Sequence, residues 1–367
     1  MLKQYKLKNF KFVLVICIIV LNAIGVMLVG SASPNDQKKQ LIGMISGLVI
    51  MMVLMWIDYS FILKFSWLLY LFSLALLILV RFAGDGSKGA QRWFEIGSFR
   101  FQPSELVKIL LILFFSYYFM KHEEKINTPK TIIFSFILVG IPLALIILQP
   151  NLSMTIIIAL VFAAMLFVAG LSYKIVVGVL ATCVPAALIM ISLIIQDKIP
   201  FIQSYQLGRI MAWLYPEDYP DIAYQQQNSI MAIGSGLLWG KGLNNTDATS
   251  VKNGKFILEP QNDFIFAVAG EEMGFAGTAV IIILLLLITI QCIFIARKAK
   301  DTAGKLICCG MAALIGFQSI VNIGVATGLL PNTGVTLPFV SYGLTSLWSL
   351  YIGIGFVLNV GLQPKKY

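Results

Sequence analysis

Apolar runs long enough to cross a lipid bilayer as helices limit the fold of this chain more than any other feature. A membrane-spanning helix needs about 20 mostly apolar residues. Of the 367 residues, 59% are hydrophobic and only 12% are charged, whereas a soluble domain carries roughly 25% charged residues. We therefore expect one all-α, multi-pass membrane domain over residues 1–367, with about ten transmembrane helices. The expected spans are residues 10–31, 41–57, 61–82, 104–120, 131–148, 152–171, 174–196, 264–296, 305–329 and 342–361.

The distribution of charge predicts how these spans are oriented. An even number of spans places both ends of the chain on one side of the membrane. If that side is the cytoplasm, the inner segments hold more than half of the lysines and arginines and few of the acids, as the positive-inside rule requires. We therefore expect a multi-pass protein of the cytoplasmic membrane with both termini in the cytoplasm. The net charge of +10 then follows from topology and gives no support to a nucleic-acid partner.

This topology places three polar segments on the outer face: residues 83–103, 197–262 and 329–345. Residues 197–262 form a large loop between the seventh and eighth spans, far longer than an ordinary connection, and its aromatic residues and the amphipathic piece YQLGRIMAWLYP argue against disorder. In residues 329–345, prolines and glycines interrupt the apolar pattern. Such irregular backbone at membrane depth is tolerated only inside protein or beside a wet cavity. We expect the three segments to form one extracytoplasmic site.

Three carboxylates lie where the large loop returns to apolar sequence: Asp263, Glu271 and Glu272. A charged side chain near the bilayer centre costs at least ~2.5 kcal/mol, so such groups are usually paired, hydrated or functional. Asp263 has two interpretations. It either caps the helix that follows, since Asn262 and Asp263 are both good N-cap residues, or its carboxylate takes part in chemistry.

Charged residues also lie before and within the fourth span. Arg92 beside Trp93 fits an ordinary membrane-interface pair or a binding site, and the sequence leaves both interpretations open. Glu105 and Lys108 are three residues apart, a spacing that places both side chains on one face of a helix. We expect a structural ion pair, because each charge relieves the burial cost of the other.

The segment YQQQNSIMAIGSGLLWGKGL, residues 224–243, offers amides, a hydroxyl and several glycines. The glycines let a backbone approach a ligand closely, but close packing between helices explains them equally well. The single histidine, His122, lies in an inner loop, so an outer site must work without histidine. The cysteines lie in apolar runs without metal-ligand spacing and have the pattern of small core residues.

Four blocks of the sequence resemble the SEDS family (shape, elongation, division and sporulation), the peptidoglycan polymerases that include RodA, FtsW and SpoVE. These blocks are GAQRWFEIGSFRFQPSELVK, YQQQNSIMAIGSGLLWGKGL, LEPQNDFIFAVAGEEMGFAG and LPNTGVTLPFVSYG, in the family's order and at its spacing. Four positions depart from the usual pattern: Asn262 replaces Thr, Asn151 replaces Asp, Ser153 replaces Gly, and Leu344 replaces Gly. By its length the chain is most like RodA, so we expect a role in cell elongation and shape.

The resemblance implies a peptidoglycan glycosyltransferase that polymerises lipid II into glycan strands at the outer face of the cytoplasmic membrane. Such an enzyme inverts the anomeric carbon and releases undecaprenyl pyrophosphate. The implied partners are lipid II, the growing lipid-linked glycan, membrane lipid and a class B penicillin-binding protein. Two alternatives are a lipid II flippase and a non-enzymatic scaffold for a transpeptidase. Against the flippase, the two halves of the chain show no matching pair of interrupted segments.

This reaction needs a general base near the acceptor hydroxyl and positive charge near the departing pyrophosphate. The resemblance at LEPQNDFIF makes Asp263 the candidate base, with Glu271 and Glu272 as secondary candidates. A divalent cation, Mg²⁺ or Mn²⁺, would help to neutralise the diphosphate, although the sequence shows no dedicated metal ligands. The candidates for binding substrate or pyrophosphate are Arg92, Trp93, Arg209, Gln225, Ser229, Lys241 and Ser341.

Overall fold

The computed structural model describes residues 9–84, 92–96, 99–178, 204–245 and 256–363, with the single positions 181, 185, 250 and 254. Within this part of the chain, eight helices are long and apolar enough to cross a membrane, and α7 (Leu152–Val168) is a shorter apolar helix. The predicted helical membrane fold is confirmed, while the predicted span 174–196 lies mostly outside the described residues. The eight helices are α1 (Phe12–Ala32), α2 (Pro34–Leu54), α4 (Ser66–Ala83), α5 (Pro103–Lys121), α6 (Pro129–Ile147), α11 (Ile265–Arg297), α12 (Thr302–Ala326) and α13 (Leu344–Leu362).

Two predicted spans have different boundaries in the structure. The helix α2 begins at Pro34, well before the predicted start, because proline suits the first turn of a helix, where its missing N–H is not needed. The predicted third span is divided. The short helix α3 (Tyr59–Leu63) has Asp58 as its N-cap, which accepts a hydrogen bond from the Ser60 N–H at 2.9 Å, and α4 begins only at Ser66.

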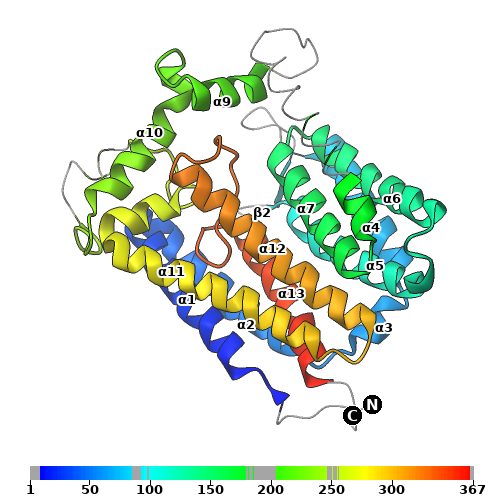
Figure 1. The fold of residues 1–367 in the computed structure, drawn as a ribbon. Helices are drawn as coiled ribbons and strands as arrows, with labels where there is room; N and C mark the ends of the chain where they lie inside the picture. The colour runs from blue at the N-terminus through cyan, green and yellow to red at the C-terminus, as the bar shows by residue number, and fades with distance from the viewer. Residues whose placement is uncertain are drawn as a thin grey trace.

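The helices form a bundle in which α5 and α13 are the most buried. Figure 1 shows α12 and α13 between α1 and α11 on one side and α4 to α7 on the other. Helices at the periphery expose large apolar side chains, such as Ile45 of α2 and Leu68 of α4, which are 56% and 63% exposed. A protein surface of this kind is suited to lipid chains, which are as apolar as leucine.

The outer segments lie at the end of the bundle opposite to the start of α1 and the end of α13 (Figure 1). The amphipathic piece is helix α9 (Ser204–Leu214), which is followed by α10 (Pro220–Ser235). The first outer segment contains a feature that the all-α prediction missed, an antiparallel hairpin of β1 (Phe94–Ile96) and β2 (Phe99–Phe101). The hydroxyl of Thr345 in α13 holds this hairpin by donating to the Arg100 carbonyl at 3.1 Å.

Residues 331–343 form the irregular connection between α12 and α13 that the prolines and glycines predicted. This 331–343 loop has little secondary structure of its own, so other elements must satisfy its backbone groups. Four such contacts are those from Arg209 Nη1 to the Asn332 carbonyl (3.2 Å), from the Ser153 hydroxyl to the Thr333 carbonyl, from Asn322 Nδ2 to the Val335 carbonyl (2.5 Å), and from the Tyr342 N–H to the Gln261 carbonyl (2.9 Å).

The helix α11 is broken at Gly274, whose backbone has φ 64° and ψ −165°. A break leaves N–H and C=O groups without helical partners, and residues 236–242 supply those partners. The two N–H groups after the break donate to carbonyls of this segment, and N–H groups of the segment donate to the carbonyls of Glu271 and Glu272, all at 2.8–3.1 Å. The 236–242 segment therefore docks on the broken part of α11.

Glycine is required where the two backbones meet. A Cβ built on Gly236 would lie 1.9 Å from the Gly270 oxygen, and one built on Gly240 would lie 2.2 Å from the Glu272 oxygen. No side chain fits at such distances. Of the two explanations for the glycine-rich segment, the structure therefore supports close packing of protein backbones at Gly236 and Gly240.

Candidate active site

Asp263 lies two residues before the start of α11, at the end of the bundle opposite to the start of α1, and Asn322 of α12 holds its backbone. The buried Asn322 amide donates to the Asp263 carbonyl at 2.8 Å and to the Val335 carbonyl at 2.5 Å. A single side chain thus joins α12, the approach to α11 and the 331–343 loop. A buried amide that loses its partners costs free energy, so the Asn322 contacts hold these three elements in a fixed arrangement.

The half-buried side chain of Asp263 reaches Gly334 in the 331–343 loop. A Cβ built on Gly334 would lie 3.2 Å from Oδ2 of Asp263 and 4.0 Å from Nη1 of Arg209. The carboxylate and the guanidinium therefore lie against the same glycine. Gly334 has φ 72°, a conformation that glycine adopts without strain. The structure thus brings the candidate base together with one of the candidate phosphate-binding residues.

The start of α11 does not match the capping interpretation of Asp263. The residue at the N-cap is Phe264, which has no side-chain capping hydrogen bond, and Ile265 is the first helical residue. Phe264 and Phe266 are both buried, so packing holds this end of the helix. Asp263 thus lies one position before the N-cap, and its role in chemistry stays a prediction.

Arg209 reaches the site from α9 in the large outer loop. Its Nη1 donates to the Asn332 carbonyl at 3.2 Å, and Trp213, about one turn later, donates from Nε1 to the Gly328 carbonyl at 2.8 Å. These two contacts place α9 over the connection between α12 and α13. The guanidinium is therefore held beside the loop by the position of the whole helix.

Glu271 and Glu272, the secondary candidates, are buried in α11 just before its break. Lys241 forms an ion pair with Glu271 at 2.9 Å, and the Ser31 hydroxyl of α1 donates to Glu272 at 2.6 Å. These contacts hold the 236–242 segment and α1 against α11. The surroundings of the three candidates Lys241, Glu271 and Glu272 thus fit structural roles.

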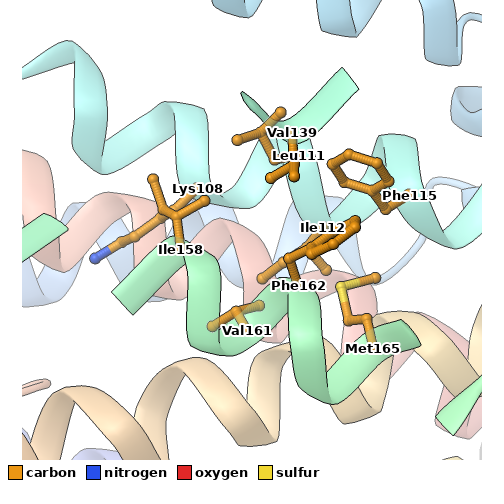
Figure 2. A pocket seen from close by; sticks show the side chains of 9 residues that line it. All are labelled: Lys108, Leu111, Ile112, Phe115, Val139, Ile158, Val161, Phe162 and Met165. Carbon is orange, nitrogen blue, oxygen red and sulfur yellow. The ribbon is translucent and has the colours of Figure 1, made fainter. Parts of the chain in front are cut away.

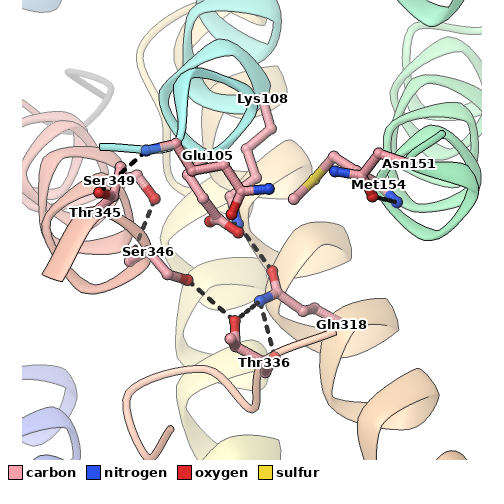
Figure 3. Close-up of polar contacts among 10 residues, drawn as sticks. Glu105, Lys108, Asn151, Met154, Gln318, Thr336, Thr345, Ser346 and Ser349 are labelled. Carbon is pink, nitrogen blue, oxygen red and sulfur yellow. Dashed lines mark hydrogen bonds and ion pairs between the residues drawn. The ribbon is translucent and has the colours of Figure 1, made fainter. Parts of the chain in front are cut away.

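The expected ion pair of Glu105 and Lys108 is present in α5, with 2.6 Å between Oε2 and Nζ and with side chains that are 5% and 1% exposed. Lys108 also donates to Oε1 of Gln318 at 3.0 Å, and the Gln318 amide donates to the carbonyl and hydroxyl of Thr336. Figure 3 shows this chain of contacts from α5 through α12 to the 331–343 loop. The buried charges are thus compensated and tied to the loop at the candidate site.

The stem of Lys108 lines a small apolar pocket between α5, α6 and α7. Figure 2 shows the Lys108 nitrogen directed away from the apolar side chains of the pocket, so the methylenes lie among apolar groups while the charge lies among polar ones. The pocket has a volume of about 10 Å³, roughly the room for one water molecule. It is too small for a sugar or a lipid. Its walls are Lys108, Leu111, Ile112, Phe115, Val139, Ile158, Val161, Phe162 and Met165.

Arg92 holds the turn between α6 and α7. Its Nε donates to the Gln149 carbonyl at 2.8 Å, and its Nη2 donates to the Pro150 carbonyl. Gln149 is fixed further by a bond from its side chain to the Leu77 carbonyl at 3.0 Å. Trp93 is half-buried next to Arg92 in the chain. These contacts give Arg92 a structural role and do not connect it to Asp263.

Two of the candidate serines have surroundings that fit packing roles. Ser229 is fully buried in α10, and its hydroxyl donates to the Ala326 carbonyl at the end of α12, at 2.8 Å. Ser341 is also buried, and its hydroxyl accepts the Leu337 N–H at 2.7 Å within the 331–343 loop. Each of these hydroxyls therefore stabilises the frame around the candidate site.

Sequence reasoning chose Gln225 but missed its neighbour Gln226. Gln225 is half-buried, whereas Gln226 is buried and donates to the carbonyls of Val325 and Leu330 at 2.8 and 2.7 Å. The signal was the helical period, since Gln226 lies three residues before Ser229 and shares its face. Gln318 and Asn322 of α12 were missed too, although two amides four residues apart in an apolar span are a recognisable signal.

The departures from the family pattern are accommodated locally, and the Ser153 hydroxyl donates to the Thr333 carbonyl. Asn151 still caps α7, because its side chain accepts the Met154 N–H at 3.3 Å. Asn262 donates to Glu259 at 3.0 Å. Leu344 is the first residue of α13, and its side chain packs on Gly43 of α2. Within the described part of the chain, no three His, Cys, Asp or Glu side chains form a group that could hold a metal ion, so the divalent cation stays a prediction.

Comparison with known proteins places this arrangement in a family. A family model described as "Cell cycle protein" and built on FtsW, RodA and SpoVE matches residues 5–366. The chain belongs to the FtsW/RodA/SpoVE family. The resemblance inferred from the four sequence blocks, two of which contain Arg92 and Asp263, is thereby confirmed.

Relatives in this family match over nearly their whole length. "Probable peptidoglycan glycosyltransferase FtsW" of Trichlorobacter lovleyi is 34% identical over 379 residues, covering 99% of this chain and 96% of that protein. "Peptidoglycan glycosyltransferase MrdB" of Escherichia coli is 34% identical over 357 residues, covering 96% and 93%. The Rod shape determining protein RodA of Thermus thermophilus matches in structure with a TM-score of 0.68 and 26% identity, covering 96% of both chains.

A further solved structure, described as "Structural coordination of polymerization and crosslinking by a peptidoglycan synthase complex", contains a chain that matches with a TM-score of 0.78 and 28% identity. The match covers 96% of this chain and 97% of that chain. The fold of the FtsW/RodA/SpoVE family therefore extends over almost all of the present chain.

Proposed function

We propose that this chain is a peptidoglycan glycosyltransferase that joins lipid II units into glycan strands at the outer face of the cytoplasmic membrane. The observation that carries the proposal is the meeting of the Asp263 carboxylate and the Arg209 guanidinium at Gly334. It is supported by membership of a family whose curated relatives include peptidoglycan glycosyltransferases.

In the proposed reaction, a hydroxyl oxygen of the acceptor sugar forms a bond to the anomeric carbon of the donor. The bond from that carbon to the diphosphate oxygen breaks, and undecaprenyl pyrophosphate leaves with the bonding electrons. Because this is one displacement, the α-linked sugar of lipid II becomes a β-linked unit of the glycan. Asp263 takes the proton of the attacking hydroxyl, a contribution typically worth 10²–10⁴-fold in rate.

Among the described residues, Arg209 is the candidate cation that lies nearest to the candidate base. Its planar guanidinium can bind two phosphate oxygens at once, and the 331–343 loop holds it near the candidate base. Negative charge develops on the diphosphate as the bond breaks, so a fixed cation stabilises the transition state more than the ground state. The donor's anomeric carbon would then lie between Asp263 and Arg209.

We also propose lipid II, the growing lipid-linked glycan, membrane lipid and a class B penicillin-binding protein as partners. The last is supported by the structural relative that belongs to a complex for polymerization and crosslinking. The chain is equally similar to the FtsW and MrdB relatives, at 34% identity each. Identity therefore does not separate division from elongation, and the RodA-like role in elongation stays a proposal.

Purified protein supplied with labelled lipid II in detergent tests the proposal. We expect a ladder of glycan polymer and release of undecaprenyl pyrophosphate. Lipid II that changes leaflet in vesicles without forming polymer would instead indicate a flippase. A protein that does neither, but still binds a penicillin-binding protein, would be a scaffold.

A further inference from the structure

A second polar site lies at the other end of the bundle, where α1 begins and α11 ends. A pocket there has a volume of about 330 Å³ and is lined by Lys11, Gln291, Phe294, Ile295 and Lys298. Lys11 directly precedes α1, and Lys298 directly follows α11. The pocket shares no residue with the candidate active site, so the proposed glycosyl transfer leaves it unexplained.

The two lysines make this pocket positively charged. Among the ion pairs found between described residues, none includes Lys11 or Lys298. The next acid along the chain, Asp301, has other partners, since it accepts the Tyr59 hydroxyl at 2.9 Å and caps α12 by accepting the Gly304 N–H at 2.7 Å. Two cations therefore lie at this pocket, whereas the Asp301 carboxylate is bound by the Tyr59 hydroxyl and the start of α12.

The surroundings of Lys11 favour a bound anion. Burial lowers the pKa of Lys11, and the charge of Lys298 lowers it further. Both effects oppose the charged ammonium, and a negative group between the lysines would counter them by attraction. The helix α1 adds to this preference. Its N-cap residue is Lys11, which gives no capping acceptor to the first N–H groups, and such a helix end favours negative charge.

The surfaces beside the pocket are apolar and exposed. Phe12 and Ile16 of α1 are 65% and 56% exposed, and Ile293 and Phe294 of α11 are 44% and 50% exposed. In a membrane-spanning bundle, such surfaces contact lipid chains. A ligand that matches the whole region therefore has a negative head and apolar chains.

We propose that this pocket binds the phosphate group of an anionic phospholipid, such as phosphatidylglycerol, with the acyl chains lying along α1 and α11. On the expected topology, the lipid comes from the cytoplasmic leaflet. Basic pockets between transmembrane helices on this side suit anionic lipid headgroups. The Gln291 amide offers a neutral donor for the phosphate or the glycerol, and the aromatic ring of Phe294 lies at the boundary of head and chain.

Native mass spectrometry of the whole protein in nanodiscs of phosphatidylcholine with added phosphatidylglycerol measures this preference. We expect wild type to retain phosphatidylglycerol selectively and the double variant Lys11→Gln, Lys298→Gln to lose it, by about fivefold in affinity for each lysine. The matched control is Lys64→Gln with Lys130→Gln. These are two exposed lysines on the same expected side, so the net charge change is identical while the pocket is intact.

Several outcomes overturn the proposal: equal retention of both lipids by wild type, equal loss in the control variant, or displacement of the lipid by millimolar inorganic phosphate alone, which would make this a site for a free anion. Thermal unfolding in detergent shows whether the double variant folds. The charge-keeping variant Lys11→Arg, Lys298→Arg should keep the preference, and a loss there would also contradict the proposal.

Discussion

At the scale of single residues, Asp263 differs from the buried acids Glu105, Glu271 and Glu272 in its burial and its neighbours. Glu105 is paired with Lys108, Glu271 with Lys241, and Glu272 accepts from Ser31. The carboxylate of Asp263, in contrast, is half-buried and faces Gly334 in an irregular loop. A general base must be within reach of a substrate hydroxyl. Of the candidates Asp263, Glu271 and Glu272, only Asp263 is not buried, and the role of general base for Asp263 stays our proposal.

Asp263→Asn is expected to abolish polymerisation while leaving the fold intact. The amide keeps the size of the carboxylate but cannot take a proton, so the initial rate with labelled lipid II should fall at least about hundredfold. The melting temperature and the binding of lipid II should stay near the wild-type values. If Asp263 were only a cap, the amide oxygen of the variant would serve equally well, so both the rate and the stability would stay near the wild-type values.

The neighbouring variant Asn262→Ala is the matched control for this experiment. Asn262 is also half-buried and donates to Glu259 at 3.0 Å, so its loss disturbs the same turn without removing the carboxylate. Its rate should stay within a few-fold of wild type. Polymerisation by Asp263→Asn at a similar level would place the base elsewhere, and Glu271 would be tested next.

At the scale of elements, the ion pair in α5 is predicted to hold the 331–343 loop in place. Glu105→Ala leaves Lys108 as an uncompensated buried charge, which costs about 3–5 kcal/mol. The apparent melting temperature in detergent and the folded yield should therefore both fall, and activity should fall with them.

The double variant Glu105→Leu, Lys108→Met tests whether Glu105 has a structural or a catalytic role. Replacing a buried ion pair by apolar residues of similar volume is often neutral for stability, but Oε1 of Gln318 loses the Lys108 donor, at a cost of about 1–3 kcal/mol. This protein should therefore melt below wild type but above Glu105→Ala. A Glu105→Ala protein with unchanged melting behaviour but no activity would show that Glu105 belongs to the catalytic machinery.

The docking of the 236–242 segment on α11 is tested by two glycine variants. Gly240 and Gly242 both have positive φ, 79° and 94°, but a Cβ would lie 2.2 Å from the Glu272 oxygen at Gly240 and would meet nothing within 4 Å at Gly242. Gly242→Ala should cost about 1 kcal/mol of backbone strain. Gly240→Ala should lower the melting temperature clearly more, and equal effects would mean that the close contact is not important for stability.

The spans were predictable from the sequence because a run of about 20 apolar residues has one stable form in a bilayer. The division of α3 from α4 and the break of α11 at Gly274 were not. Both depend on what packs outside the helix. The Gly274 break is stable only because residues 236–242, far away in the sequence, satisfy its open backbone groups.

The candidate site was predictable in its parts but not in its assembly. Asp263 and Arg209 were each indicated, yet their meeting at Gly334 depends on how α9 lies over the 331–343 loop. Ser229 was chosen as a binding residue because a hydroxyl in a polar segment has the same pattern whether it faces substrate or core. Its full burial is a property of the fold that no local sequence pattern contains.

At the scale of the whole molecule, the expected orientation in the membrane can be tested by labelling single cysteines in a background without native cysteines. Glu217→Cys lies between α9 and α10, and Lys125→Cys lies between α5 and α6. Both positions are exposed. A reagent that does not cross membranes should label Glu217→Cys in intact cells and Lys125→Cys only after lysis. The reverse pattern would place the candidate site in the cytoplasm and contradict the proposed function.

The break in α11 at Gly274 also indicates where the candidate site lies relative to the membrane. The helix has 33 residues, about 50 Å at 1.5 Å per residue, whereas the hydrocarbon layer is about 30 Å thick. The part after Gly274 alone is about 34 Å long, enough to cross the bilayer, so on the expected topology the break lies near the outer boundary. Asp263 lies near the same boundary, because its carbonyl accepts from Asn322, which is about 30 Å along α12 from Thr302. A substrate can thus keep its prenyl chain in the lipid while its sugars react in water, and the lengthening strand has no reason to enter the bilayer.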